Sequence, residues 1–140
     1  MESNPCFISL IDHNDRPLLI HVAKSENQDI DSVFKFNTFS NISLDYFGSD
    51  LYEWMNTSQK GRDIKDLFQL EGVSVYGKLI KQTSLKIVVG FWSKTDHSDE
   101  TLENVFNDIS RLYIRCKFNP FSNSDEDLIE QLQKKFDERF

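Results

Sequence analysis

The sequence predicts an α+β fold in which helices cover both faces of a largely antiparallel sheet. Strand-like and helix-like segments follow one another in the order β-β-α-β-β-β-α-α. Most neighbouring strand-like segments are separated by a few turn-forming residues, which favours antiparallel pairing. Residues 85–91 (LKIVVGF) are almost continuously apolar, as is typical of a central strand covered on both faces. The length of 140 residues fits one domain, which we expect to span residues 1–140.

The first two strands are predicted at residues 6–11 (CFISLI) and 18–22 (LLIHV). Between them lies the segment DHNDRP, which is rich in residues that favour turns. Two short apolar runs around such a turn indicate a β-hairpin that starts almost at the N-terminus.

A long helix is predicted from about residue 30 to Asp45 or Tyr46, followed by irregular structure at Gly48. Residues 30–55 contain no proline and lack the alternation of a strand. At helical spacing, one face carries Ile30, Val33, Phe34, Asn37, Asn41, Leu44 and Asp45. A second, apolar side carries Phe36, Phe39, Ile42, Ser43 and Phe47. Two apolar sides suggest that this helix touches more than its own sheet.

Three further strands are predicted at residues 66–70, 73–81 and 85–91, after a loop at residues 56–62. The middle segment, VSVYGKLIK, alternates between two sets of side chains, as a strand does. Glu71-Gly72 and Gln82-Thr83 stand where tight turns are required, although neither pair is an ideal hairpin turn.

Residues 98–121 combine an amphipathic helix, capped around Ser98, with a terminating turn. One helical face is predicted to be core, and it contains Leu102, Val105, Phe106, Ile109, Leu112, Tyr113 and Cys116. Asn119, Pro120 and Phe121 then end the helix, because proline has no N–H and disfavours helical geometry in the residue before it. We interpret this tripeptide as a structural stop, with Phe118 and Phe121 helping to bury the junction. An exposed Asn-Pro-Phe ligand for an EH domain is the alternative.

A last helix is predicted from about residue 124 to residue 140. Ser124 and Asp127 have the spacing of a capping box, with aspartate in place of the usual glutamate or glutamine. Its apolar face carries Leu128, Ile129, Leu132, Phe136 and Phe140.

The composition argues against several classes of protein. Hydrophobic residues make up 39% of the chain and there are twelve phenylalanines, which argues against disorder. The net charge is −7 and no basic stripe is visible, so we expect no nucleic-acid partner. The same charge disfavours direct adhesion to anionic lipid. No apolar run approaches the roughly 18–20 residues that cross a bilayer, so we expect no direct membrane insertion.

No motif for catalysis, metal binding or cofactor binding is present. The histidines His13, His21 and His97 lack i, i+4 spacing, and the two cysteines are not in a C-x-x-C pair. There is no G-x-S-x-G elbow and no phosphate-binding G-x-x-x-x-G-K-[ST] loop. Cys6 and Cys116 are expected to be small core residues, and a disulfide between them is not required. We therefore expect a non-enzymatic protein with no cofactor, in a reducing compartment.

Large apolar and aromatic residues gather at the end of the first helix and in the segment after it. They are Tyr46, Phe47, Leu51, Tyr52 and Trp54. Core packing is the default interpretation of each. A partner surface is the alternative, because aromatic side chains are enriched in protein interfaces.

Four segments, in order, resemble the sedlin family, the small subunits of the TRAPP vesicle-tethering complexes. The first hairpin, CFISLIDHNDRPLLIHV, has the family's His-x-Asp-x-Pro turn, and Ser43-Leu44-Asp45 resembles the end of its first helix. VSVYGKLIKQTSLKIVVGF resembles its last hairpin, and DISRLYIRCKFNPFS resembles the helix that ends in Asn-Pro-Phe. The resemblance covers most of the chain outside residues 48–64. Within the family, the chain is most similar to the sedlin-related, TRAPP-associated subunit of fungi.

The resemblance implies a longin-like fold, with five antiparallel strands, the first helix on one face and the last two on the other. It also implies an adaptor that binds other TRAPP subunits and supports assembly of this exchange factor for a Rab GTPase, with indirect contact to the GTPase. The expected location is cytoplasmic and peripheral, at Golgi and early secretory membranes. The family's Leu-Asp pair has been linked to partner contact. The candidate partner interface is therefore Leu44, Asp45, Tyr46, Phe47, Leu51, Tyr52 and Trp54.

The alternative is another longin-type trafficking regulator, such as a SNARE regulatory domain or the small chain of a coat adaptor. A SNARE would be expected to carry a C-terminal heptad segment and a membrane anchor. A coat chain would be expected to show motifs of its own family. A small enzyme, the third class, would require a convergent cluster of polar groups that the sequence does not reveal.

Overall fold

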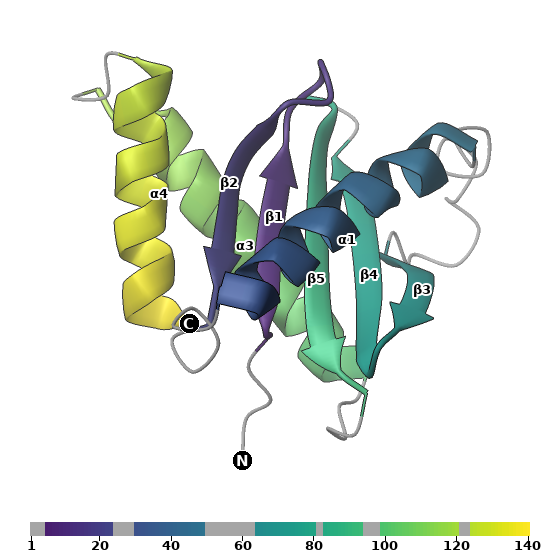
Figure 1. Ribbon diagram of the computed structural model, residues 1–140. Helices are drawn as coiled ribbons and strands as arrows, with labels where there is room; N and C mark the ends of the chain where they lie inside the picture. The colour runs from purple at the N-terminus through teal and green to yellow at the C-terminus, as the bar shows by residue number, and fades with distance from the viewer. Residues whose placement is uncertain (1–4, 24–29, 50–63, 81–82, 94–98, 121–123) are drawn as a thin grey trace.

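Five strands form one antiparallel sheet in the spatial order β2-β1-β5-β4-β3 (Figure 1). The computed structural model describes residues 5–23, 30–49, 64–80, 83–93, 99–120 and 124–140. The strands are β1 (Phe7–Ile11), β2 (Pro17–Val22), β3 (Ile64–Leu70), β4 (Val73–Ile80) and β5 (Leu85–Trp92). The helices are α1 (Ile30–Ser49), α3 (Asp99–Lys117) and α4 (Asp125–Arg139). The predicted order of elements is confirmed.

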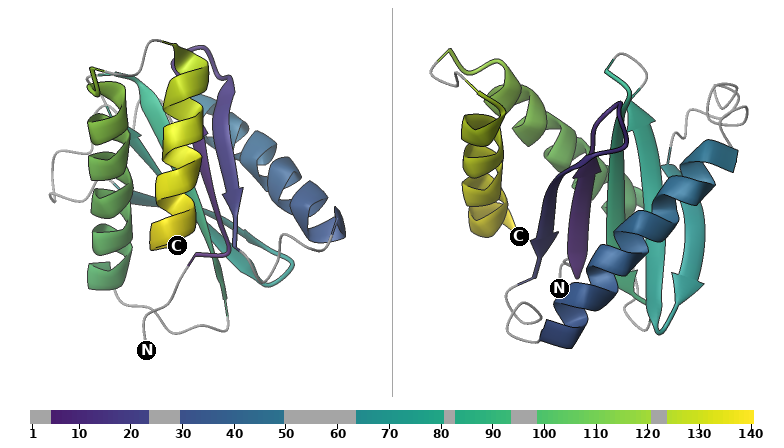
Figure 2. Two further views of the ribbon diagram at one scale, coloured as in Figure 1. Left: turned by 90° about the vertical axis from the view of Figure 1, so that its left-hand side faces the viewer. Right: turned by 45° about the horizontal axis from the view of Figure 1, so that its top comes forward.

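The helices divide between the two faces of the sheet as predicted. Figure 2 shows α3 and α4 side by side against one face and α1 against the other. The central strand β5 supplies both sides: Ile87, Val89 and Phe91 pack under α3 and α4, and Val88 packs under α1. The near-continuous apolar character of this strand is thus explained by cover on both faces.

The helix α1 continues to Ser49, so the prediction that it ends at Asp45 or Tyr46 is wrong. A glycine inside a helix costs about 1 kcal/mol relative to alanine, which is why Gly48 was expected to break it. The burial of Phe47 outweighs that cost. Its side chain is only 2% exposed and fills the space above Gly77. A Cβ atom on Gly77 would lie 2.9 Å from the Phe47 ring. Full burial of such a side chain contributes about 1.5–3 kcal/mol.

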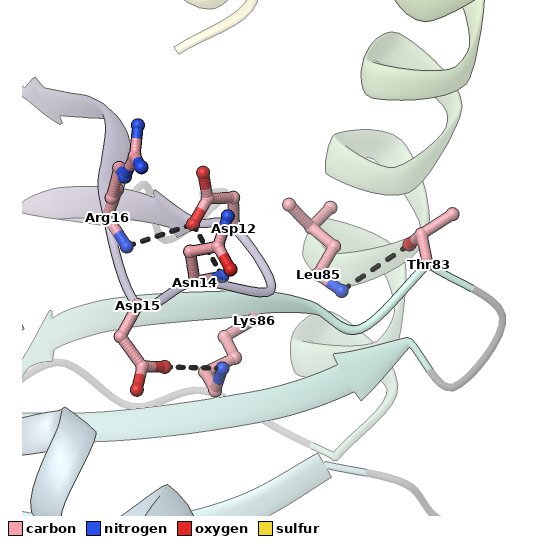
Figure 3. Close-up of polar contacts among 7 residues, drawn as sticks. All are labelled: Asp12, Asn14, Asp15, Arg16, Thr83, Leu85 and Lys86. Atoms are coloured by element: carbon pink, nitrogen blue, oxygen red, sulfur yellow. Dashed lines mark hydrogen bonds and ion pairs between the residues drawn. The ribbon is translucent and has the colours of Figure 1, made fainter.

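The turn between β1 and β2 is organised by Asp12 (Figure 3). Its carboxylate accepts hydrogen bonds from the backbone amides of Asn14 and Arg16, each at 2.9 Å. The bond from the Arg16 amide is the main reason that the pKa of the Asp12 carboxyl is lowered from its ordinary value. Asp15, at φ 61°, accepts a 2.7 Å bond from Lys86 Nζ and so ties this turn to β5. The cluster of turn-forming residues therefore has a structural role.

The helix α3 presents the predicted apolar face to the sheet. Six of its seven positions are buried and Leu112 is half-buried against the same core. The helix ends at Lys117. One expectation here is wrong: Phe118 does not bury the junction with α4, because its side chain is 77% exposed. The backbone turns after Lys117 so that Asn119, and not Phe118, faces α4, where its side-chain amide donates to Gln131 Oε1 at 2.9 Å.

The helix α4 begins as predicted, with Ser124 as its N-cap. The Ser124 hydroxyl accepts a hydrogen bond from the Asp127 amide at 3.3 Å, which is one half of a capping box. Leu128, Leu132 and Phe136 are buried, and Ile129 and Phe140 are half-buried against the same core. The outer strand β2 is held by α4, since the ring of His21 meets Phe136 edge-on at 5.9 Å.

Cys6 and Cys116 are buried thiols on opposite sides of the sheet and form no disulfide with each other. Cys6 belongs to the core under α1, and its thiol donates to the Gly90 carbonyl at 3.2 Å. Cys116 belongs to the core under α3 and α4, where burial raises the pKa of its thiol against the opposing charge of Lys135. Both are core residues, as predicted, and the sheet separates them.

Candidate functional site

The outer side of α1 carries apolar side chains that the sheet does not cover. We define the α1 outer face as Ile30, Phe34, Asn37, Asn41, Leu44 and Asp45, which share one side of the helix. Ile30 is 71% exposed and Phe34 is 68% exposed. Phe36, Phe39 and Phe47 point the other way, into the core. Of the two apolar sides predicted for this helix, the structure packs one against the sheet and leaves Ile30 and Phe34 of the other exposed.

Polar side chains on or beside the α1 outer face bond to their own helix. Asn37 Nδ2 donates to the Val33 carbonyl at 2.8 Å, and Thr38 Oγ1 donates to the Phe34 carbonyl at 3.0 Å. A polar group that is already hydrogen-bonded costs much less to cover than one that loses its water without replacement. These side chains therefore allow a partner to cover the face.

The one cation of α1 is turned away from the α1 outer face. Lys35 Nζ lies 5.0 Å from the centre of the Trp92 ring and 5.4 Å from that of Phe36, which are cation–π distances. Asp45, near the end of the same helix, is exposed on the α1 outer face. The α1 outer face is consequently apolar where the helix begins and acidic where it ends.

The residues of the predicted partner interface that the structure describes differ in how exposed they are. Asp45 is exposed, and Leu44 is half-buried. Tyr46 is half-buried and stacks on Phe68 of β3 with ring centres 5.3 Å apart. Phe47 is a correction: it is buried in the core under α1 and offers almost no surface to a partner. The remaining three, Leu51, Tyr52 and Trp54, lie outside the described residues.

Ile30 and Phe34 were not assigned to the interface by sequence reasoning. The two-sided pattern of the helix already contained the indication, because both residues share a side with Leu44 and Asp45. A pattern with two apolar sides does not say which side meets the sheet. The phenylalanines decide it, since Phe36 stacks on Phe7 of β1 with ring centres 5.0 Å apart.

The Asn-Pro-Phe segment is only partly within the described residues. Asn119 is half-buried and bonds to Gln131 of α4, and Pro120 is exposed. Phe121 lies outside the described residues. The Asn119 contact ties the beginning of this segment to α4.

Comparison with known proteins assigns the family. The family model described as Sedlin matches residues 10–140. The chain belongs to the sedlin family. The TRAPP-associated protein TCA17 of Saccharomyces cerevisiae is 46% identical to this sedlin-family chain over 146 aligned residues, which cover 100% of the chain and 95% of the yeast protein. Among solved structures, Myxococcus xanthus MglB gives a TM-score of 0.45 at 13% identity, over 96% of this chain and 85% of that one.

Membership of the sedlin family agrees with the expectation that the chain is not an enzyme. Within the described ranges, no group of three or more His, Cys, Asp or Glu side chains could hold a metal ion. His13 is exposed in the first turn, and His97 lies outside the described residues. His21 is buried, with Nδ1 3.2 Å from Gln133 Nε2 and 3.5 Å from Asp137 Oδ1, so it links β2 to α4.

A surface groove runs beside α4. Its described lining comes from one side of that helix and consists of Glu126, Ile129, Glu130, Gln133, Lys134, Asp137 and Glu138. None of these is a histidine, cysteine or hydroxyl residue that could act as a nucleophile. In the part of the chain that the structure describes, no helix is long and apolar enough to span a membrane.

Proposed function

We propose that this sedlin-family chain is a non-enzymatic, TRAPP-associated adaptor that acts through protein–protein contacts. The observation that carries the proposal is the 46% identity, over the full length of the chain, to a yeast protein named for its association with TRAPP. Identity at this level along 95% of the relative supports a role of the same kind for this chain. Other TRAPP subunits are therefore the expected partners.

The α1 outer face is the proposed docking surface for such a subunit. Ile30 and Phe34 supply apolar area, while Asn37 makes its hydrogen bond within the helix. Asp45 supplies a charge at the far end, where a cation of the partner would select the register. Interfaces commonly have an apolar centre and a polar rim, and this face has both.

The proposed interface continues from Leu44 and Asp45 through Tyr46 into the segment that follows α1. Leu51, Tyr52 and Trp54 remain in it on sequence grounds, because large apolar and aromatic side chains dominate the energetics of interfaces. Phe47 has an indirect, structural role, because its buried side chain holds the end of α1 against β3 and β4.

Through these contacts the chain would support assembly of the TRAPP exchange factor, and would meet its Rab GTPase only indirectly. The expected location is cytoplasmic and peripheral at the Golgi and early secretory membranes, with the larger complex providing the attachment. The net charge of −7 supports attachment through a partner and not through anionic lipid.

The test is affinity purification of the tagged full-length chain from its own cells, with Phe34→Ser and Asp45→Tyr variants. We expect the wild type to recover TRAPP subunits and each variant to lower that recovery at least tenfold, because each removes an exposed group of the α1 outer face. Leu70→Ser is the matched control for Phe34→Ser, since Leu70 is also exposed, at 45%, but lies at the end of β3.

Circular dichroism should show the same secondary structure and melting temperature for both variants as for the wild type. Recovery of no TRAPP subunit with the wild type would contradict the proposal, and recovery of SNARE or coat components instead would favour the alternative class. An unfolded Asp45→Tyr variant would show that Asp45 is structural.

A further inference from the structure

The C-terminal half of α3 also leaves apolar side chains in solvent. Ile114 is 52% exposed and Phe118 is 77% exposed, four residues apart and therefore on one side of the helix. Arg111 and Arg115 lie on that same side and are exposed. We define these four residues as the α3 patch. The apolar face of α3 that covers the sheet is a different one, so the fold itself gives no reason for this patch.

The α3 patch is cationic on an acidic protein. Between Asp108 and Asp125 the chain contains three cations and no acidic residue, although its net charge is −7. Asp108 offsets the charge of Arg111 only in part, because Arg111 Nη1 lies 4.0 Å from one carboxylate oxygen while the other oxygen accepts a 2.7 Å bond from Arg139. No ion pair to Arg115 forms within the described ranges. The patch is therefore a local positive region.

Phe118 is held in its exposed position by an ordered turn. Its amide donates to the Ile114 carbonyl at 3.0 Å, and the Asn119 amide lies 3.4 Å from the Cys116 carbonyl. The Asn119 side chain then anchors the next residue to Gln131 of α4 at 2.9 Å. Because the backbone on both sides of Phe118 is held by these bonds, little backbone freedom is lost when a partner binds the ring.

We propose that the α3 patch docks into a partner protein, with Phe118 inserted in an apolar pocket whose rim carries aspartate or glutamate. A ring that projects from a helix end requires a concave partner surface. Arginine and aromatic side chains are the residues most often found at the energetic centre of interfaces. Arg111 and Arg115 call for carboxylates around the pocket, which gives the contact its charge complementarity.

A bilayer fits the α3 patch less well than a protein does. Attraction of a few cations to anionic lipid is opposed by the net charge of −7 on the whole molecule. Membrane-bound helices also lay a long apolar face into the lipid, and the long apolar face of α3 is buried against the sheet.

The α3 patch goes beyond the docking surface proposed above, and its argument does not depend on that surface. The helices α1 and α3 lie on opposite faces of the sheet (Figure 2). Both surfaces can therefore be occupied at the same time, by two different proteins or by two parts of one assembly. A chain with two such surfaces would join its partners and not merely bind one of them.

The experiment places a photoreactive phenylalanine analogue, p-benzoylphenylalanine, at position 118 of the full-length chain in its own cells. The matched control carries the analogue at position 107, which is exposed on the same side of α3 three turns earlier, in its acidic half. We expect position 118 to give a crosslink to one protein at least tenfold above position 107. The crosslinked peptide, mapped by mass spectrometry, should contain aspartate or glutamate around apolar residues.

A charge-reversed pair, Arg111→Glu with Arg115→Glu, should lower the crosslink at least tenfold, whereas Arg111→Lys with Arg115→Lys should largely retain it. Circular dichroism should find both pairs folded. Equal yield at positions 107 and 118, a crosslink to lipid or to a second copy, or no effect of charge reversal would each overturn the inference. If the affinity purification recovers no TRAPP subunit but position 118 still gives the crosslink, only the proposed function is contradicted. If TRAPP subunits are recovered but position 118 gives no crosslink, only this inference is contradicted.

Discussion

At the scale of single residues, buried hydroxyl groups show how closely α1 is fitted to the sheet. Ser9 of β1 and Ser40 of α1 are both buried, and their Oγ atoms lie 2.6 Å apart. One hydroxyl donates to the other, so each has a hydrogen-bond partner although both side chains are buried. Ser110 of α3 differs, because its buried Oγ has no hydrogen-bond partner among the residues that the structure describes.

We expect replacement by alanine to have opposite effects on stability at Ser40 and at Ser110. Ser40→Ala should lower the free energy of unfolding by about 1–3 kcal/mol, because it leaves the Ser9 hydroxyl buried without its partner. Ser110→Ala should leave the free energy of unfolding unchanged or raise it by about 1 kcal/mol, because it removes an unsatisfied group and improves helix propensity. Urea unfolding followed by circular dichroism measures both.

The double variant Ser9→Ala with Ser40→Ala is the control for this prediction. It removes both hydroxyls, so it should be more stable than the sum of the two single variants implies. Additive losses would mean that the 2.6 Å contact contributes nothing specific.

At the scale of elements, the turn between β3 and β4 carries backbone strain. Glu71 has φ 52° and Gly72 has φ 79°, so both central residues of this two-residue turn are in the left-handed region. This is the pattern of a type I′ turn, which favours Asn-Gly. A glutamate in this conformation costs roughly 1–2 kcal/mol relative to right-handed geometry, and asparagine costs less.

Glu71→Asn should therefore raise the free energy of unfolding by about 0.5–1 kcal/mol without changing the sheet register. Thermal unfolding in parallel with wild type measures the change. Glu103→Asn is the control, because Glu103 is an exposed residue with the same charge inside α3, where asparagine is a poorer helix former. A stabilised Glu103→Asn, or a destabilised Glu71→Asn, would contradict the explanation.

The elements differ in how far their sequences determine them. The helix α3 was predicted with its whole apolar face, because one stripe of seven residues leaves a single way to pack. The end of α1 was misplaced, because the burial of Phe47 above Gly77 is a tertiary contact that local propensity does not contain. The exposure of Phe118 was missed for the same reason, since it follows from the bond between Asn119 and α4.

The candidate site was predictable only in part. Leu44 and Asp45 were selected by family resemblance, and Asp45 is exposed as a partner contact requires. Ile30 and Phe34 needed the structure, because only the packing of Phe36 on Phe7 shows which side of α1 faces outward. The α3 patch likewise becomes visible only when the covered face of α3 is known.

At the scale of the whole molecule, the two cores share one sheet. The strand β5 contributes Val88 to the core under α1 and Phe91 to the core under α3 and α4. If β5 leaves the sheet, both cores lose part of their packing and are exposed to water. Cooperative unfolding of the whole fold is the consequence.

The two cysteines test that cooperativity, one from each core. Both thiols are buried, at 2% exposure for Cys6 and 3% for Cys116, and burial raises the pKa of Cys116 and so keeps it protonated. We expect no reaction of either thiol with a thiol reagent in the native state. With increasing urea both should become reactive at one midpoint, measured separately in Cys6→Ser and Cys116→Ser variants.

Those two variants need one correction, because replacing a buried thiol shifts the midpoint of the whole fold. Each midpoint should therefore be compared with that of the same variant by circular dichroism. If one thiol reacted well before its own variant unfolded, the two cores would be independent and the prediction would be wrong.

The pairing of β1 with β5 also means that, during synthesis, one edge of β1 stays unpaired until β5 has been made. Phe7 pairs with Gly90 and Ile11 with Lys86, so β1 leaves the ribosome well before β5, the strand with which it pairs. At about 5–20 residues per second, its open edge stays unpaired for roughly 4 to 16 s. During that interval Ile8 and Leu10, fully covered in the finished fold, have nothing to cover them. The nascent chain is therefore expected to depend on chaperones, and a slower ribosome would lengthen its exposure to aggregation.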